Sequence, residues 1–189
     1  AYSRDLTFNA LNRVEYRYRG INAKLVVPIG GLESTLTLIG AYDARDAENI
    51  DQDVDFGPGD FARAFGGDEL ATKTAELRLD SRLSDSFSTL FGLFYSREEV
   101  DAIDTTTILP AFSGLPFNVV RTTTNQTRAD TYAAFGTLFW NPTTDWEIAL
   151  GLRYDREDRV ANGSIVTALG PLGTVGGPTP QAQIKSSEW

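Results

Sequence analysis

The dominant pattern along the chain is an alternation of apolar and polar residues, which predicts β-strands rather than helices. From Ala75 to Leu83 every second residue is small or apolar, and the residues between them are charged. After a short polar turn, the alternation resumes from Phe87 to Tyr95. The two runs predict a β-hairpin with one face that avoids water and one that seeks it.

The same alternation of apolar and polar residues predicts two further hairpins. One joins residues Tyr132–Trp140 and Trp146–Tyr154 through a polar turn. The other joins Ile21–Val27 and Leu36–Tyr42 through a turn at residues 28–31. The pattern therefore predicts six strands in three antiparallel hairpins.

The segments between the hairpins are long and polar, at roughly residues 43–71, 97–129 and 157 onward, and we interpret them as loops. Loops of that length are unusual in a compact soluble domain. Tight turns at one end of the strands and long loops at the other are typical of outer-membrane β-barrels, in which the turns are periplasmic and the loops extracellular.

Aromatic residues support a membrane-spanning barrel, because they lie eight positions apart on one face of three strands. Eight steps of about 3.3 Å, tilted by roughly 40°, rise on the order of 20 Å, close to the ~25 Å apolar band of such barrels. The residues expected at the two membrane interfaces are Phe87, Tyr95, Tyr132, Trp140, Trp146 and Tyr154.

The alternation also assigns residues to the two faces of the wall. The residues predicted to face lipid are Leu77, Leu79, Phe91, Leu93, Ile148, Leu150 and Leu152. The residues predicted to face the lumen are Glu76, Arg78, Asp80, Arg82, Glu147, Arg153 and Asp155. Most of these charges would form salt links across strands or to a plug, and the sequence does not say which of them contacts a ligand.

The amino-acid composition excludes several kinds of catalytic site, metal site and partner. The chain contains no His, Cys or Met, which excludes imidazole catalysis, thiol nucleophiles, disulfides and Cys/His zinc sites. The net charge is -9 without a basic block, which argues against a nucleic-acid partner. No apolar run is long enough for a transmembrane helix. The chain begins without Met and without a signal peptide, so we expect a processed or excised segment.

Acidic residues are the remaining candidates for a site. The run Asp51, Asp53 and Asp55 resembles the start of a calcium loop, but Phe56 and Ala62 stand where an EF-hand requires Gly and Glu. An acidic loop with Asp43, Asp46, Glu48, Asp60, Asp68 and Glu69 would attract a cation or simply be solvated. The adjacent pairs Glu98–Glu99 and Glu157–Asp158 point to opposite faces of a strand, so neither suits glycosidase chemistry. We expect no catalytic, metal or cofactor site and no enzyme activity.

Several segments, in order, resemble the barrel of TonB-dependent outer-membrane receptors. They are residues 51–56, 76–81, 92–98, 132–136, Trp146 and 150–157, and the resemblance covers about Asn12 to Glu157. The resemblance implies a plugged barrel of about 22 strands that imports siderophore-bound iron or similar scarce nutrients with energy from TonB. It implies outer-membrane lipid, a plug domain, TonB and a nutrient ligand as partners.

A whole barrel at this spacing needs roughly 650 residues, so residues 1–189 are expected to be part of the barrel domain, without plug or signal peptide, and truncated at both ends. Residues 181–188 do not alternate, which predicts that the chain stops before the next strand. The expected fold is an open curved sheet of an antiparallel up-and-down barrel. Two alternatives remain: a passive porin or other outer-membrane barrel, and a soluble β-sandwich such as a carbohydrate-binding module.

Overall fold

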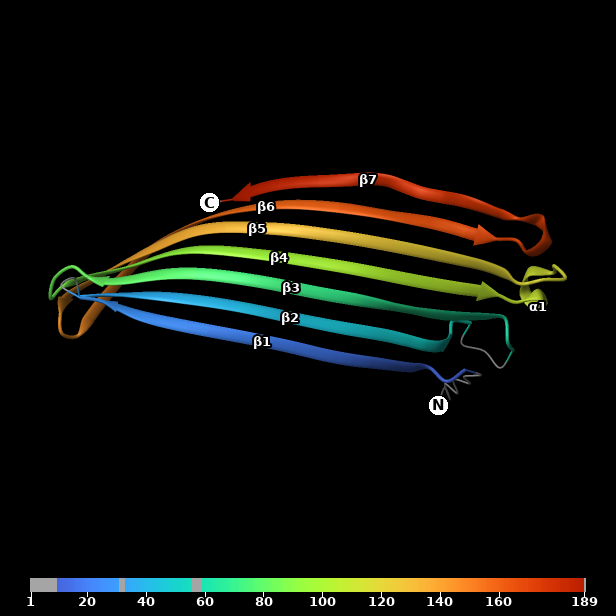
Figure 1. Ribbon diagram of the computed structural model, residues 1–189, viewed down its shortest axis with the longest axis horizontal. Helices are drawn as coiled ribbons and strands as arrows, with labels where there is room; N and C mark the ends of the chain where they lie inside the picture. Colours follow the sequence, from blue (N-terminus) through green and yellow to red (C-terminus); the bar gives the residue numbers. More distant parts are fainter. Residues whose placement is uncertain (1–9, 31–32, 56–58, 189) are drawn as a thin grey trace, which may run out of the picture.

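Seven strands pair in chain order in one open antiparallel sheet in the computed structural model of the protein (Figure 1). The structure describes residues 10–30, 33–55 and 59–188. The strands are β1 (Arg13–Ile29), β2 (Ser34–Asp53), β3 (Ala62–Arg82), β4 (Phe87–Ile108), β5 (Val119–Thr143), β6 (Trp146–Ala168) and β7 (Thr174–Glu188). A short helix α1 (Pro110–Ser113) follows β4, and a 3₁₀ turn η1 (Gly170–Leu172) follows β6.

The all-β antiparallel fold is confirmed, but the prediction of long loops is wrong. β2 continues to Asp53, β4 to Ile108 and β6 to Ala168, so most of the segments expected to be loops extend the strands. The alternation of apolar and polar residues fades in these extensions because both faces are polar there. Threonine-rich stretches such as residues 105–107 and 122–124 still favour strands, and cross-strand pairing satisfies their backbone groups.

β7 is the second difference from the sequence-based expectation. Residues 182–188 pair with β6 over Asp155–Ala161, although we expected the chain to stop before another strand. Both faces of this strand are exposed, so it needs no apolar alternation. β7 also contains Pro178 and Pro180, which strands tolerate at the edge of a sheet. The sheet therefore has seven strands in place of six.

The two ends of the sheet differ as predicted, although the connections are shorter than expected. Only Thr144 and Asp145 separate β5 from β6. The connections that carry α1 and η1 lie at the opposite end of the sheet (Figure 1). None of the helices in the described part of the chain is long and apolar enough to cross a membrane. Part of the predicted turn at residues 28–31 lies outside the described residues.

Hydrogen bonds hold the connection between β2 and β3, which lies at the same end of the sheet as α1 (Figure 1). The Asp55 Oδ2 accepts hydrogen bonds from the backbone N–H groups of Phe61 and Ala62, each at 3.0 Å. The Arg63 guanidinium donates to Asp60 at 2.9 Å and to Asp51 at 3.0 Å. The connection is therefore ordered by carboxylates that bind backbone and guanidinium donors.

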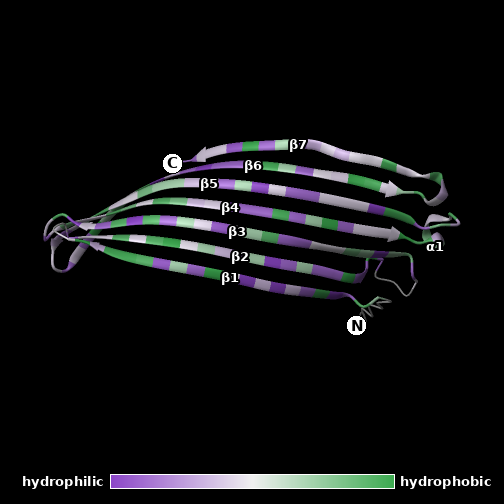
Figure 2. Cartoon of the chain, viewed as in Figure 1, coloured by the Kyte–Doolittle hydropathy of each residue, from purple (hydrophilic) through white to green (hydrophobic). Residues whose placement is uncertain are grey.

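The register gives the sheet two chemically different faces. Direct cross-strand partners point to the same side, as do alternate residues along a strand. Because Leu77 pairs with Leu93, and Leu138 with Leu150, one side gathers large aliphatic residues, and we call it the apolar face. The other side carries Arg153, and we call it the polar face. Figure 2 shows the alternation of hydrophobic and hydrophilic residues along the strands.

The sheet has almost no core of its own. The buried apolar residues among those described are all alanines: Ala44, Ala47, Ala129 and Ala133. Leu150 and Leu152 of the apolar face are 69% and 77% exposed. A single layer with one aliphatic face needs an apolar environment against that face.

Candidate functional site: the two faces of the wall

All seven residues predicted to face lipid lie on the apolar face. Leu77 and Leu79 of β3 pair with Leu93 and Phe91 of β4. Ile148, Leu150 and Leu152 of β6 pair with the β5 residues Trp140, Leu138 and Gly136, which are themselves the partners of Phe87, Thr89 and Phe91. The shared face follows from the register. Its contact with lipid remains a prediction.

A pair of aromatic residues lies at each end of the aliphatic part of the apolar face. Near the tight turns, the rings of Phe87 and Trp140 stack with centroids 6.1 Å apart. Eight residues further along each strand, the rings of Tyr95 and Tyr132 lie 5.1 Å apart. Trp146, which pairs with Thr143 nearer the tight turn, is 68% exposed. Two aromatic rows at this spacing are typical of the interfaces of a membrane barrel.

The residues predicted to face the lumen lie together on the polar face, but two of their ion pairs are not those expected. Arg78 binds Glu76, two residues away on β3, instead of a partner on another strand. Arg153 donates to both oxygens of Asp155 at 2.8 Å, again along one strand. Residues two apart on a strand share a face, so pairs of this kind need no neighbouring strand. Arg82 pairs with Asp85 and Glu33 near the turn.

An aromatic platform on the polar face supports Arg153. Its guanidinium carbon lies 5.8 Å from the ring centroid of Phe94 and 5.7 Å from that of Phe135. These distances are within the range of cation–π attraction. Phe135 in turn covers Gly92, its direct partner on β4. The sequence alternation placed both Arg153 and Phe94 on this face, but it did not show that the guanidinium would lie against the rings.

A charged zone begins on the apolar face directly beyond the tyrosine row. The Tyr95 hydroxyl donates to Asp130 at 2.8 Å, and Arg97 donates to the same carboxylate oxygen at 2.7 Å. Arg128 donates to the other oxygen at 3.1 Å. Arg156, the direct partner of Tyr132, binds Asp158 at 3.2 Å. The apolar face thus changes from aliphatic to charged within one row of residues.

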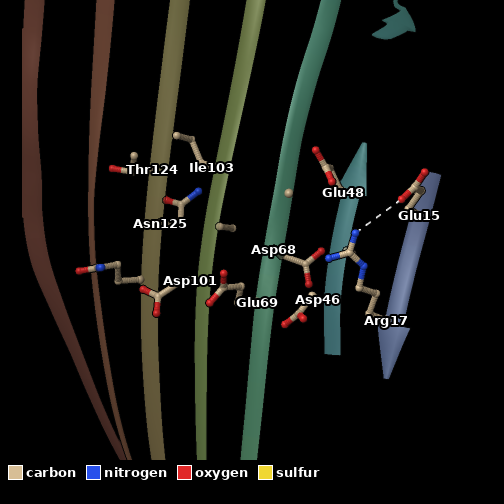
Figure 3. Close-up of a pocket in the computed structure, with 14 residues that line it drawn as sticks. Glu15, Arg17, Asp46, Glu48, Asp68, Glu69, Asp101, Ile103, Thr124 and Asn125 are labelled. Atoms are coloured by element: carbon tan, nitrogen blue, oxygen red, sulfur yellow. Dashed lines mark ion pairs between the residues drawn. The ribbon is translucent and has the colours of Figure 1, made fainter. Parts of the chain in front are cut away.

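The acidic residues expected in a single loop lie mostly on β2 and β3 and on both faces. Asp46, Glu48 and Glu69 lie on the apolar face beyond the charged zone, in a groove of about 640 Å³ that Glu15 also lines (Figure 3). Of the described residues that line this groove, Arg17 alone is basic, and its Nη2 lies 3.9 Å from Glu15. Across residues 10–30, 33–55 and 59–188, no set of three or more carboxylates is arranged to hold a metal ion. Phe56, used to reject a calcium loop, lies outside this part of the chain.

Asp43 and Asp68 lie on the polar face beside Arg45, a residue that the sequence analysis did not single out, and Asp68 also borders the groove of Figure 3. The Arg45 guanidinium binds the Asp68 carboxylate. The exposed rings of Tyr16 and Tyr18 stack next to it with centroids 6.2 Å apart. Continuing the alternation into the polar part of β1 would have placed both tyrosines on this face.

The adjacent carboxylates do not converge. Glu98 pairs across the sheet with Ala129 and Glu99 with Arg128, so the two glutamates project from opposite faces. Glu157 accepts a hydrogen bond from Arg159 at 3.0 Å, whereas Asp158 binds a different arginine on the other face.

Comparisons with known proteins agree with this architecture. A family model described as TonB-dependent receptor-like, β-barrel, matches residues 1–184. The structure of the ferric yersiniabactin uptake receptor FyuA from Yersinia pestis superposes with a TM-score of 0.70 at 15% sequence identity, over 93% of this chain and 24% of FyuA. A search of curated protein sequences finds no match. The likeness to FyuA concerns the fold, and the chain spans about a quarter of that receptor's length.

Proposed function

Because the chain belongs to the TonB-dependent receptor β-barrel family, we propose that it forms part of the wall of an outer-membrane transporter that imports siderophore-bound iron or a similar large nutrient. Family membership makes it a bacterial outer-membrane protein. The proposal has three parts: that the receptor imports its ligand, that the ligand is a large nutrient of this class, and that TonB supplies the energy. The family is one of receptors.

The observation that carries this proposal is the separation of the two faces. The register collects all seven predicted lipid-facing residues on one side, and on the other side it collects the predicted lumen-facing charges Glu76, Arg78, Arg153 and Asp155. In this arrangement the apolar face meets lipid and the polar face lines the lumen, where a plug domain would meet Arg78 and Arg153. We place residues 1–189 in the barrel wall, and contacts with TonB would be made by other parts of the receptor.

Spin labelling of β6 tests the orientation. Single-cysteine variants from Trp146 to Asp155 of the full-length receptor are labelled and scored for access to oxygen and to a polar relaxant. We expect the labels at 146, 148, 150, 152 and 154 to be accessible to oxygen and those between them not to be. Access of the polar relaxant to both faces would contradict a lipid-facing wall.

Uptake measurements test the transport step separately. Cells that express the receptor are supplied with radioactive iron bound to yersiniabactin or to a hydroxamate siderophore, with or without TonB. We expect the receptor to accumulate one of these complexes, and accumulation to be lost without TonB. Uptake that persists without TonB would indicate a passive porin.

A further inference from the structure

A hollow of about 400 Å³ lies on the polar face across β1, β2 and β3. Gly20, Asp43 and Thr72, which are direct partners on the three strands, line it in one row. The next row of the lining contains Tyr18, Arg45 and Leu70, which are again direct partners. We call this cavity the Tyr18 hollow.

The Tyr18 hollow lies beyond the apolar band, on the side of the sheet away from the tight turns. The row of Tyr95 continues across the sheet to Ala23 of β1. Gly20 lies three residues beyond Ala23, at about 3.3 Å per residue. In the orientation proposed above, this part of the polar face lines the lumen near its extracellular mouth, where a nutrient enters.

Asp43 supplies the hollow with an exposed carboxylate that has no ion pair or hydrogen bond among the described residues. The carboxylate reaches over Gly20, because a Cβ added to Gly20 would be 2.6 Å from the Asp43 Oδ1. Any side chain at position 20 would push this oxygen aside. The glycine therefore keeps the carboxylate in the hollow.

Both arginines that line the hollow are bound by other carboxylates. Arg45 binds Asp68, and Arg19 binds Asp46 on the opposite face. The charge of Asp43 is therefore not balanced within the hollow.

Tyr18 and Thr72 complete a set of groups that suits an alkylammonium ion. The Tyr18 side chain is 72% exposed, and its ring is stacked on that of Tyr16. An aromatic ring attracts a cation that lies over its face, and a carboxylate and a hydroxyl both accept hydrogen bonds from an ammonium group. An anionic group, in contrast, would be repelled by Asp43.

The wider polar face beyond the row of Tyr95 has the same sign of charge. On the described strands, its acids are Asp43, Asp68, Glu98, Asp104 and Glu157, and its bases are Arg45, Arg121 and Arg159. Asp68 binds Arg45, and Glu157 binds Arg159. The carboxylates that remain outnumber the one guanidinium that remains, and a lumen wall with this surplus attracts cations.

We propose that the Tyr18 hollow binds an alkylammonium group of the transported nutrient, so that the receptor selects ammonium-bearing iron complexes over neutral and anionic ones. Asp43 and Thr72 accept the N–H groups, and the Tyr18 ring covers the cation. The inference rests on the proposed function, because it requires the polar face to line the lumen of an importer.

Two iron complexes that differ only at the ammonium group test the site. Ferrioxamine B is a ferric trihydroxamate with a terminal ammonium, and N-acetylation removes this charge while the iron centre stays the same. Quenching of tryptophan fluorescence measures the binding of each complex to the full-length receptor in detergent. The heat-dependent shift of the folded barrel in gel electrophoresis shows that each variant has assembled.

Two variants change the hollow, and each has a matched control. Asp43→Asn removes the charge, and Glu48→Gln removes an exposed charge on the opposite face of the same strand. Gly20→Ala displaces the Asp43 carboxylate, whereas Gly40→Ala adds a Cβ whose nearest neighbour is 3.9 Å away.

We expect the wild-type receptor to bind ferrioxamine B about fivefold more tightly than its N-acetyl form, as one ion pair at an accessible site provides. Asp43→Asn should abolish this preference by weakening the binding of ferrioxamine B alone. Gly20→Ala should reduce the preference, and both controls should keep it.

The site would be overturned if the wild type bound neither complex, or if it bound both equally. A preference that persists in Asp43→Asn would also overturn it. Equal weakening of both complexes in Asp43→Asn would show that the carboxylate holds the barrel or a lysine of the plug, and not the ligand. If Gly20→Ala does not assemble, Asp43→Asn decides the question, because it changes an exposed residue.

A failure of the site is distinguishable from a failure of the proposed function. TonB-dependent uptake of ferric yersiniabactin by a receptor that does not discriminate between the two ferrioxamines would leave the proposed function standing and overturn the ammonium site. Uptake that does not depend on TonB would contradict the proposed function, whichever complex is bound.

Discussion

The ring of Phe135 lies directly over Gly92, so close that a Cβ added to Gly92 would be 2.1 Å from the ring Cζ. Gly92 is buried, and only a residue without a side chain leaves room for the ring at this point. The Arg153 guanidinium lies against the same ring on its β6 side. One glycine on β4 therefore allows a stack that links three strands on the polar face.

Gly92→Ala should destabilise the barrel by about 1–3 kcal/mol, since the Phe135 ring must leave its place. Urea unfolding of the full-length receptor in lipid vesicles measures the change. Gly40→Ala is the control, because the nearest atom to its added Cβ is the Thr74 carbonyl oxygen at 3.9 Å, an ordinary contact. Combining Gly92→Ala with Phe135→Leu should recover part of the loss, and no recovery would show that the ring is not the cause.

Leu150→Arg should cost about 2–4 kcal/mol near the bilayer midplane, because a charge on the lipid face loses its hydration. Arg153→Leu, three positions along β6 on the polar face, should assemble almost normally. The amount of folded receptor in isolated outer membranes compares the two. Equal insertion of both variants would show that the face assignment is wrong.

Stacking of Phe87 on Trp140 should contribute about 0.5–1.5 kcal/mol beyond the burial of the two rings. The rings are within 5° of parallel and belong to direct partners on β4 and β5. A double-mutant cycle with Phe87→Leu and Trp140→Leu, followed by urea unfolding, isolates this coupling. Additive losses in the double variant would mean that the rings act independently at the interface.

Asp55→Ala should loosen the connection between β2 and β3 without unfolding the sheet. The carboxylate binds the backbone N–H groups of Phe61 and Ala62, and its loss leaves both donors without that partner, at a local cost of about 1–3 kcal/mol. Hydrogen exchange read by mass spectrometry should show faster exchange at these two amides. Asp46→Ala, which removes an exposed ion pair with Arg19, should leave their exchange unchanged.

The sequence predicted the fold where the two faces differ in polarity. The alternation through Leu77 and Leu79, and again through Leu150 and Leu152, gave the correct hairpin partners because a shift by one residue would exchange the faces. It failed in the threonine-rich half of β4 and in β7, where both faces are polar. There the backbone pairing, and not side-chain burial, determines the strand, and a single sequence carries little sign of it.

The candidate site was predictable only in part, for a related reason. The alternation along a strand assigns a residue such as Arg153 to one face of the sheet. It does not show whether the ion-pair partner of that residue lies on the same strand or on a neighbouring one. The position of the small residue Gly136 between Phe91 on one side and Leu152 on the other was harder still to predict. That relationship requires the register of three strands together, and no single hairpin pattern contains it.

The three register shifts of the sheet have a consequence for how such a wall changes in evolution. They lie at Asn49/Gln52, Trp140/Thr143 and Ala161/Gly163, all at or beyond the ends of the aliphatic band between the aromatic rows. An insertion of an odd number of residues within that band would move every following side chain of the strand to the opposite face of the sheet. An insertion of an even number of residues would keep each side chain on its face. Strands of this wall can therefore gain or lose residues singly only near their ends, and in pairs elsewhere.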